Sequence, residues 1–181
     1  FMEKHLGGLK RTDDDKVLTK TMINNYAKNE LLPSPEKKKY SKDHVLLLTF
    51  IYYFKSFLTI GDIKTLTCEL SEKYFKCDSK PDLSDIYTSL LECYPHIMDD
   101  FKHNILNALR LTEKCMENTD TSDEYLEKFF FISLLGLDVY MKKQLIETMI
   151  DEMADEQQKK NEAEKATAKK SSDKDKDKDK D

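Results

Sequence analysis

Hydrophobic residues recur every three or four positions along most of this chain, and the pattern predicts helices separated by short polar breaks. The first helix with a clear boundary begins at Thr19 or Thr21, because either hydroxyl can cap an N-terminus, and it continues to about Glu30. Its buried stripe consists of three side chains: Met22, Ile23 and Tyr26. Its opposite face is expected to be exposed and carries four polar side chains: Lys20, Asn24, Asn25 and Lys28.

A Pro-Ser-Pro sequence at 33–35 ends this pattern, because proline cannot continue a helix. Residues 36–40 are rich in lysine and could form either a tight basic turn or a minimal hairpin. The next helix begins near Ser41 and His44 and is apolar nearly all round, which is typical of a helix inside a core or between two subunits. A shorter helix follows from Ile60 to about Leu70.

After Cys77 the pattern changes, and a break at 78–81 precedes a short helix that Pro95 interrupts. The next apolar stripe predicts a helix over 97–116, and the longest pattern runs from Asp123 to roughly Lys160. Gly136 lies inside that long helix at a cost of about 1 kcal/mol relative to Ala, which indicates a close helix crossing or a kink. We expect about three helices to form a C-terminal bundle, and dimerisation through the long helix is a hypothesis beside a plain intramolecular core.

The two ends of the chain carry weaker patterns. Residues 1–6 look like the last turns of a helix that Gly7 and Gly8 end, and the opening in mid-pattern suggests a truncated helix. From Glu162 onward, alternating Lys and Asp cannot bury apolar area to offset the entropy of ordering, so this tail should be disordered. The predicted division is a helix remnant and linker at 1–15, a helix-turn-helix domain at 16–77, an assembly or sensor region at 78–160 and a tail at 161–181.

Composition narrows the class of protein. The chain has 181 residues, of which 39% are hydrophobic and 36% charged, as expected of a soluble helical protein. Its longest apolar run, residues 129–137, is shorter than the roughly 18 residues of a membrane span, and the start shows no signal peptide. We therefore expect a cytoplasmic protein. The four cysteines lie far apart without C-x-x-C spacing, which predicts reduced thiols, no metal site and no cofactor.

Charge is distributed unevenly along the chain, although the net charge is only −5. Residues 16–42 contain seven lysines against Glu30 and Glu36, whereas residues 43–161 contain thirteen basic and twenty-two acidic side chains. A compact positive patch on an acidic body is typical of a face that meets a phosphate backbone. On charge alone, a solvated lysine-rich loop is an equally good interpretation.

Three strings carry a resemblance to known families: LTKTMINNYAK, LLPSPEKKKYSKDH and LLLTFIYYFKSFLTIGDIKTL. From Lys16 to Leu70 the chain is similar to the bacterial family called domain of unknown function 1836. The same stretch resembles the DNA-binding head of the MerR family of transcription regulators. In that pattern Tyr26 takes the place of a tyrosine of the recognition helix. Lys38 and Tyr40 occupy the positions of the Arg and the Tyr of the wing.

Three departures from the MerR pattern change the expected chemistry. Asn24 and Asn25 occupy the positions of a phosphate-contacting Arg and a Tyr, the wing is shorter, and the first helix of the motif is cut off before Phe1. The resemblance still implies an all-α fold, with a MerR-like helix-turn-helix and a minimal basic wing followed by a helical bundle. It implies a sequence-specific regulator of transcription that binds double-stranded DNA as a homodimer, with an unknown effector or protein partner.

Asparagine can pair with both hydrogen-bonding groups of an adenine edge, and lysine can neutralise phosphates, so we expect salt-sensitive binding. The predicted DNA-binding residues are Thr19, Lys20, Thr21, Asn24, Asn25, Lys28, Lys37, Lys38, Lys39 and Tyr40. Solvation of a helix face is the alternative for the two asparagines, and packing behind the wing is the alternative for Tyr40.

Two other classes of function are alternatives to DNA binding. A protein-interaction module fits the short wing and the missing Arg. An enzyme fits poorly, because the chain has no Gly-rich phosphate loop and no nucleophile motif. The four histidines (His5, His44, His96 and His103) have no evident carboxylate or cysteine arrangement around them. We expect a protein without enzymatic activity.

Overall fold

The computed structural model describes residues 4, 7, 11–12, 14, 17–37, 39–119 and 122–176, with side chains as far as residue 163. Within these ranges the regular elements are all helices, which confirms the predicted all-α class. The helices are α2 (Lys20–Lys28), α3 (Lys42–Phe54), α4 (Ile60–Tyr74), α5 (Leu83–Glu92), α6 (Tyr94–Thr119) and α7 (Glu124–Lys176). The helix remnant expected at 1–6 lies almost wholly outside the described residues.

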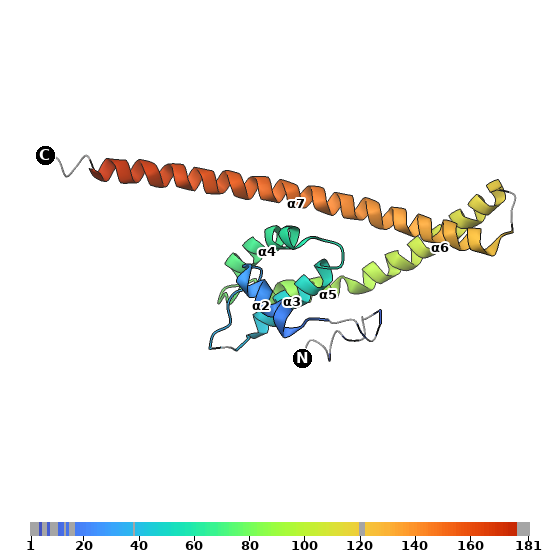
Figure 1. Cartoon of the computed structure of the whole chain (residues 1–181), viewed down its shortest axis with the longest axis horizontal. Helices are drawn as coiled ribbons and strands as arrows, with labels where there is room; N and C mark the ends of the chain where they lie inside the picture. Colours follow the sequence, from blue (N-terminus) through green and yellow to red (C-terminus); the bar gives the residue numbers. More distant parts are fainter. Residues whose placement is uncertain are drawn as a thin grey trace.

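The molecule has two parts, a head and a long hairpin (Figure 1). Helices α2 to α5 form the head, and α6 leads away from it to the tight connection with α7. Helix α7 then returns alongside α6, runs over the head beside α4 and continues past it. None of the helices in the described ranges is long and apolar enough to cross a membrane.

Local capping signals explain where the helices of the head begin. Thr19, rather than Thr21, caps α2, because its hydroxyl oxygen accepts a hydrogen bond from the Met22 N–H at 3.1 Å. Ser41 and His44 form a capping box at the start of α3, as the sequence predicted for this N-terminus. Equivalent boxes begin the next two helices and consist of Thr59 with Asp62 and Asp82 with Asp85.

The C-terminus of α2 is closed by a Schellman motif that lacks the usual glycine. The Leu31 N–H donates to the Tyr26 carbonyl at 2.9 Å, and the Glu30 N–H donates to the Ala27 carbonyl at 3.3 Å. Glu30 has a φ of 61°, in the left-handed region that disfavours residues with a Cβ. Leu31 is buried directly after it, so the motif turns the chain back into the core.

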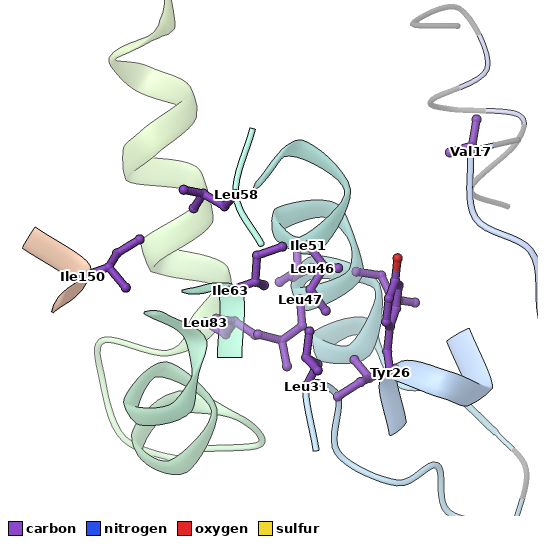
Figure 2. Close-up of a cluster of buried hydrophobic side chains, with 12 residues drawn as sticks. Val17, Tyr26, Leu31, Leu46, Leu47, Ile51, Leu58, Ile63, Leu83 and Ile150 are labelled. Atoms are coloured by element: carbon purple, nitrogen blue, oxygen red, sulfur yellow. The ribbon is translucent and has the colours of Figure 1, made fainter. Parts of the chain in front are cut away.

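Helix α3 is the centre of the hydrophobic core, which confirms one of the two placements expected for an apolar helix (Figure 2). Its Leu47 and Ile51 are fully buried and are surrounded by side chains from α2, α4, α5 and α7. The buried hydrophobic residues of this core are Val17, Tyr26, Leu31, Leu32, Leu46, Leu47, Leu48, Ile51, Leu58, Ile63, Leu83 and Ile150.

Helix α5 packs in the head, although the sequence-based division placed it with the C-terminal region. Leu83 is fully buried in the core of the head, and Tyr87 meets Phe50 of α3 with ring centroids 5.8 Å apart. Two helices rather than about three therefore make up the C-terminal region, and they form a hairpin instead of a bundle. The break at Pro95 was predicted, but the burial of Leu83 depends on contacts that the local pattern does not show.

Helix α7 docks on α4 through one buried side chain and two polar contacts. Ile150 is 3% exposed and belongs to the core of the head. Further along, the Gln157 side chain donates to the Thr65 carbonyl at 3.2 Å, and Lys160 pairs with Glu69 at 3.0 Å. Lys73 and Lys160 together lower the pKa of Glu69 to about 2.

The same helix extends to Lys176 instead of ending near Lys160. Residues 161–176 contain neither Gly nor Pro and are rich in Ala, Glu and Lys, which have high helix propensity. Most of the segment expected to be disordered is therefore helical, and residues 177–181 lie outside the described part.

Candidate nucleic-acid interface

The outward face of α2 carries the polar side chains that the sequence predicted for it. All four are exposed, namely Lys20, Asn24, Asn25 and Lys28, and the neighbouring Thr21 is exposed as well. Tyr26 lies on the opposite side and is buried in the core, where burial raises the pKa of its phenol. The hydroxyl oxygen of Thr19 accepts the capping hydrogen bond, so Thr19 positions α2 in addition to lying at its edge.

The basic segment after Pro35 is a tight turn. The Lys39 N–H donates to the Glu36 carbonyl at 2.8 Å, and these two residues form an isolated antiparallel bridge without strands on either side in the described part. Lys37 has a φ of 48°, in the left-handed region. Lys37 and Lys39 are exposed and form no ion pair with another described residue, whereas Lys38 lies outside the description. Of the two structures expected here, the chain adopts the turn.

Lys76 holds this turn on the body of the head. Its backbone N–H donates to the Asp43 carboxylate at 2.7 Å, at the start of α3. Its side-chain ammonium forms an ion pair with Glu36 and thereby lowers the pKa of that carboxyl. Because Lys76 follows α4, one residue connects the turn, α3 and α4. No local pattern in the sequence predicts these contacts.

His44 packs against the end of the basic turn from the interior of the head. It is 1% exposed, and its ring meets Tyr40 and Phe75 edge-on at centroid distances of 5.4 Å and 4.8 Å. Nδ1 accepts a hydrogen bond from the Ser41 N–H at 2.9 Å, which requires that this nitrogen carry no proton. Burial lowers the pKa of His44, with a partial opposing effect from the backbone of Pro33 and Ser34. The histidine is therefore a neutral, structural part of the site.

A groove of about 520 Å³ separates α2 from the basic turn. Its lining consists of Lys20, Ile23, Asn24, Pro35 and Tyr40. The groove brings three of the predicted residues together, namely Lys20, Asn24 and Tyr40. Thr21, Asn25 and Lys28 share the exposed face of α2 but do not line the groove. Tyr40 packs on His44, which was the alternative considered for it, and it is still 41% exposed.

No group of three or more His, Cys, Asp or Glu side chains in the described ranges could hold a metal ion. The four cysteines are free thiols. The candidate interface is therefore a surface of amides, lysines and one phenol, supported by a neutral histidine.

These features define an all-α protein in which a compact head with a basic turn is joined to a long helical hairpin. Residues 1–90 match the model of the family described as Domain of unknown function (DUF1836). The match confirms the resemblance to this family that the sequence predicted, and it reaches beyond Leu70 to include most of α5. No curated protein and no solved structure matches the chain.

Proposed function

We propose that the head is the double-stranded-DNA-binding module of a sequence-specific, MerR-like transcription regulator without enzymatic activity. In this proposal α2 is the recognition helix and the turn at 36–40 is a minimal basic wing. The observation that supports it best is the groove in which Lys20 and Asn24 of α2 face Tyr40 at the end of the lysine-rich turn.

Each side chain of this surface has a defined role in the proposal. Asn24 and Asn25 enter the major groove, where an Asn amide can both donate to and accept from an adenine edge. Lys20 and Lys28 flank them on α2, and Lys37, Lys38 and Lys39 reach the phosphates from the turn. The ion pair between Glu36 and Lys76 removes a negative charge from the turn, which leaves its lysines free for phosphate.

Selection of bound duplexes from a random-sequence pool, with the full-length protein at low salt, tests the proposal. Each phosphate contact contributes about −0.9 to the slope of log K against log salt concentration. The double variant Lys37→Glu/Lys39→Glu should therefore lose about two units of slope and bind much more weakly. The matched control is Lys114→Glu/Lys159→Glu, which makes the same change in net charge at two exposed lysines of α6 and α7. Failure to enrich any duplex, or an equal loss in both variants, would refute the proposal.

A second function, docking of a protein segment in the same groove, is favoured by its partly apolar lining. Ile23, Pro35 and Tyr40 could receive an apolar side chain of a partner. In that case the Lys37→Glu/Lys39→Glu variant would keep its partner, while Ile23→Asp would lose it. Retention of one stoichiometric protein after nuclease treatment would support this function over DNA binding.

A further inference from the structure

Two contacts of different kinds hold the two ends of the basic turn (residues 36–40) on the head. At its start, the Glu36 carboxylate pairs with Lys76, and at its end Tyr40 packs on the buried ring of His44. Inside the turn, one isolated bridge closes the chain on itself, and no strand of the described part extends this bridge into a ladder. The position of the turn therefore depends on its two anchors.

The His44 ring has one bonded nitrogen and one buried nitrogen without a partner. Nδ1 accepts a hydrogen bond from the Ser41 N–H at 2.9 Å, so the single proton of the neutral ring lies on Nε2. Nε2 is buried and donates to no described residue, although the backbone of Pro33 and Ser34 lies near the ring. An unsatisfied buried donor destabilises a fold, so helix capping alone does not explain this side chain.

Capping does not require a histidine at this position. The equivalent residues in the capping boxes of α4 and α5 are Asp62 and Asp85. Acidic side chains and glutamine can satisfy the capping amide, and a negative charge also interacts favourably with the helix dipole. What distinguishes histidine from these residues is its ordinary pKa of about 6.5, which is close to physiological pH.

A second proton on the ring is incompatible with the contacts at the end of the turn. It adds to Nδ1, where a new donor then faces the Ser41 N–H. The Ser41 hydroxyl lies 2.7 Å from Nδ1 and can rotate to accept the new N–H, but the Ser41 N–H still loses its acceptor. The imidazolium also places a charge between Tyr40 and Phe75 in a site that is 1% exposed. Such a charge is costly when no counter-charge pairs with it there.

The charged groups around His44 do not compensate for this cost. Burial is the largest effect and lowers the pKa of His44, and the Lys76 ammonium at the end of α4 lowers it further. The nearby backbone and the Asp43 carboxylate of α3 oppose this effect without reversing it. From the turn, the ring meets the Tyr40 phenol and the charge of Glu36, which is already paired with Lys76.

The two anchors of the turn respond differently to acid. The ion pair with Lys76 lowers the pKa of the Glu36 carboxyl, so Glu36 stays charged at about pH 5–6.5, where a released His44 becomes protonated. Acid therefore weakens the end of the turn and leaves its start attached. Between the two anchors, Lys37 has a φ of 48°, in the left-handed region that disfavours a residue with a Cβ, so release also relieves strain.

We propose that His44 is an acid-sensitive latch of the basic turn: uptake of a proton from solvent releases residues 39–41 from α3, and the turn moves about the Glu36–Lys76 ion pair while the rest of the head stays folded. The direction follows from linkage. The closed form has the lowered pKa and the released form the ordinary one, so acid favours release. The ratio of released to closed form rises by up to about tenfold for each pH unit below about 6.5.

Release of the turn changes the candidate interface. Tyr40 then leaves the groove that it lines with Lys20 and Asn24, and the lysines of the turn leave with it. The consequence for DNA rests on the proposed function: the interface is complete at neutral pH and opens as the pH falls. The latch itself does not depend on DNA.

NMR of the full-length chain between about pH 7.5 and 5 tests the latch alone. The Ser41 and Lys39 amide signals should shift with protonation of the His44 ring, because the first N–H bonds to Nδ1 and the second closes the turn. The amide of Leu47, in the core, should not shift with them. His44→Gln keeps an acceptor for the capping box and should abolish both shifts. The matched control His103→Gln removes an exposed histidine of α6 and should leave them unchanged.

Three results overturn the proposal: Ser41 and Lys39 amides that do not shift in this range, an equal shift in His44→Gln, or a Leu47 amide that shifts with them. The last would show that the head unfolds as a whole. If His44→Gln fails to fold, the ring of His44 in the unmodified chain decides the question. Nδ1 must carry no proton at neutral pH, and the ring and the Lys39 amide must share one midpoint; any other result refutes the latch.

Binding to a duplex obtained in the selection described above tests the consequence for the interface. Added positive charge alone strengthens DNA binding as the pH falls, so a decrease is specific to the latch. From about pH 7.5 to 5.5, at about 0.1 M salt, affinity should fall about tenfold, the contribution of one phosphate contact. His44→Gln should show no decrease, and an equal pH dependence of the two proteins overturns the link between latch and interface. If no duplex is selected, DNA binding is refuted, and the NMR result still decides the latch.

Discussion

Docking of α7 on the head depends mainly on Ile150, so Ile150→Ala should weaken it. The Ile150 side chain is 3% exposed and lies in the core with residues of α3 and α4. Truncation of a buried Ile to Ala costs about 2–5 kcal/mol, from lost transfer free energy and from the cavity that remains. We expect the lower part of this range, about 2–3 kcal/mol, because the site lies at the edge of the core, where the two helices can move closer together. The two polar contacts, Gln157 with Thr65 and Lys160 with Glu69, should then become less populated.

Urea denaturation at one fixed protein concentration measures the loss in free energy of unfolding. Hydrogen exchange of the backbone amides shows whether α7 separates from α4 before the head unfolds. The matched control is Met149→Ala, one residue earlier on the same helix, where the side chain is 56% exposed. A loss for Ile150→Ala no larger than that for Met149→Ala would show that α7 is not held on the head by this contact.

Two further predictions concern the head. Folding favours the neutral form of His44 and lowers its pKa, so the stability that this residue contributes is present above its ordinary pKa of about 6.5 and is lost as the pH falls below it. His44→Gln, which can keep the capping box, should flatten the fall in denaturation midpoint below that pH, whereas the exposed His103→Gln should not; equal pH profiles for the two variants would contradict this reasoning. Glu30→Gly should raise the melting temperature by about 2–4 °C, because glycine adopts the left-handed conformation of the Schellman motif without strain. Both variants lose the exposed ion pair with Lys64, but only Glu30→Ala keeps the strain, so a thermal scan in which Ala equals or exceeds Gly would refute the explanation.

Local signals in the sequence predicted much of the head. Hydroxyl caps and the Pro-Ser-Pro break located α2 and the start of α3, and helical spacing placed Asn24 and Lys28 on the exposed face. The left-handed residue that ends α2 was not predicted, because Glu30 stands where a glycine would have been the signal.

Contacts between distant residues could not be predicted in the same way. Lys76 reaches Asp43 and Glu36 across 33 and 40 positions, so the support of the basic turn appears only once α3 and α4 are packed together. The assignment of α5 to the head likewise depends on where Leu83 finds apolar neighbours.

The unbroken course of α7 has a mechanical consequence. The helix packs against α6 and, further along, bonds to α4 at Gln157. The thirty-three residue steps from Glu124 to Gln157 span about 50 Å of α-helix. Because a continuous helix transmits a displacement along its axis, a shift at the far end of the hairpin would reach the contact between Gln157 and Thr65.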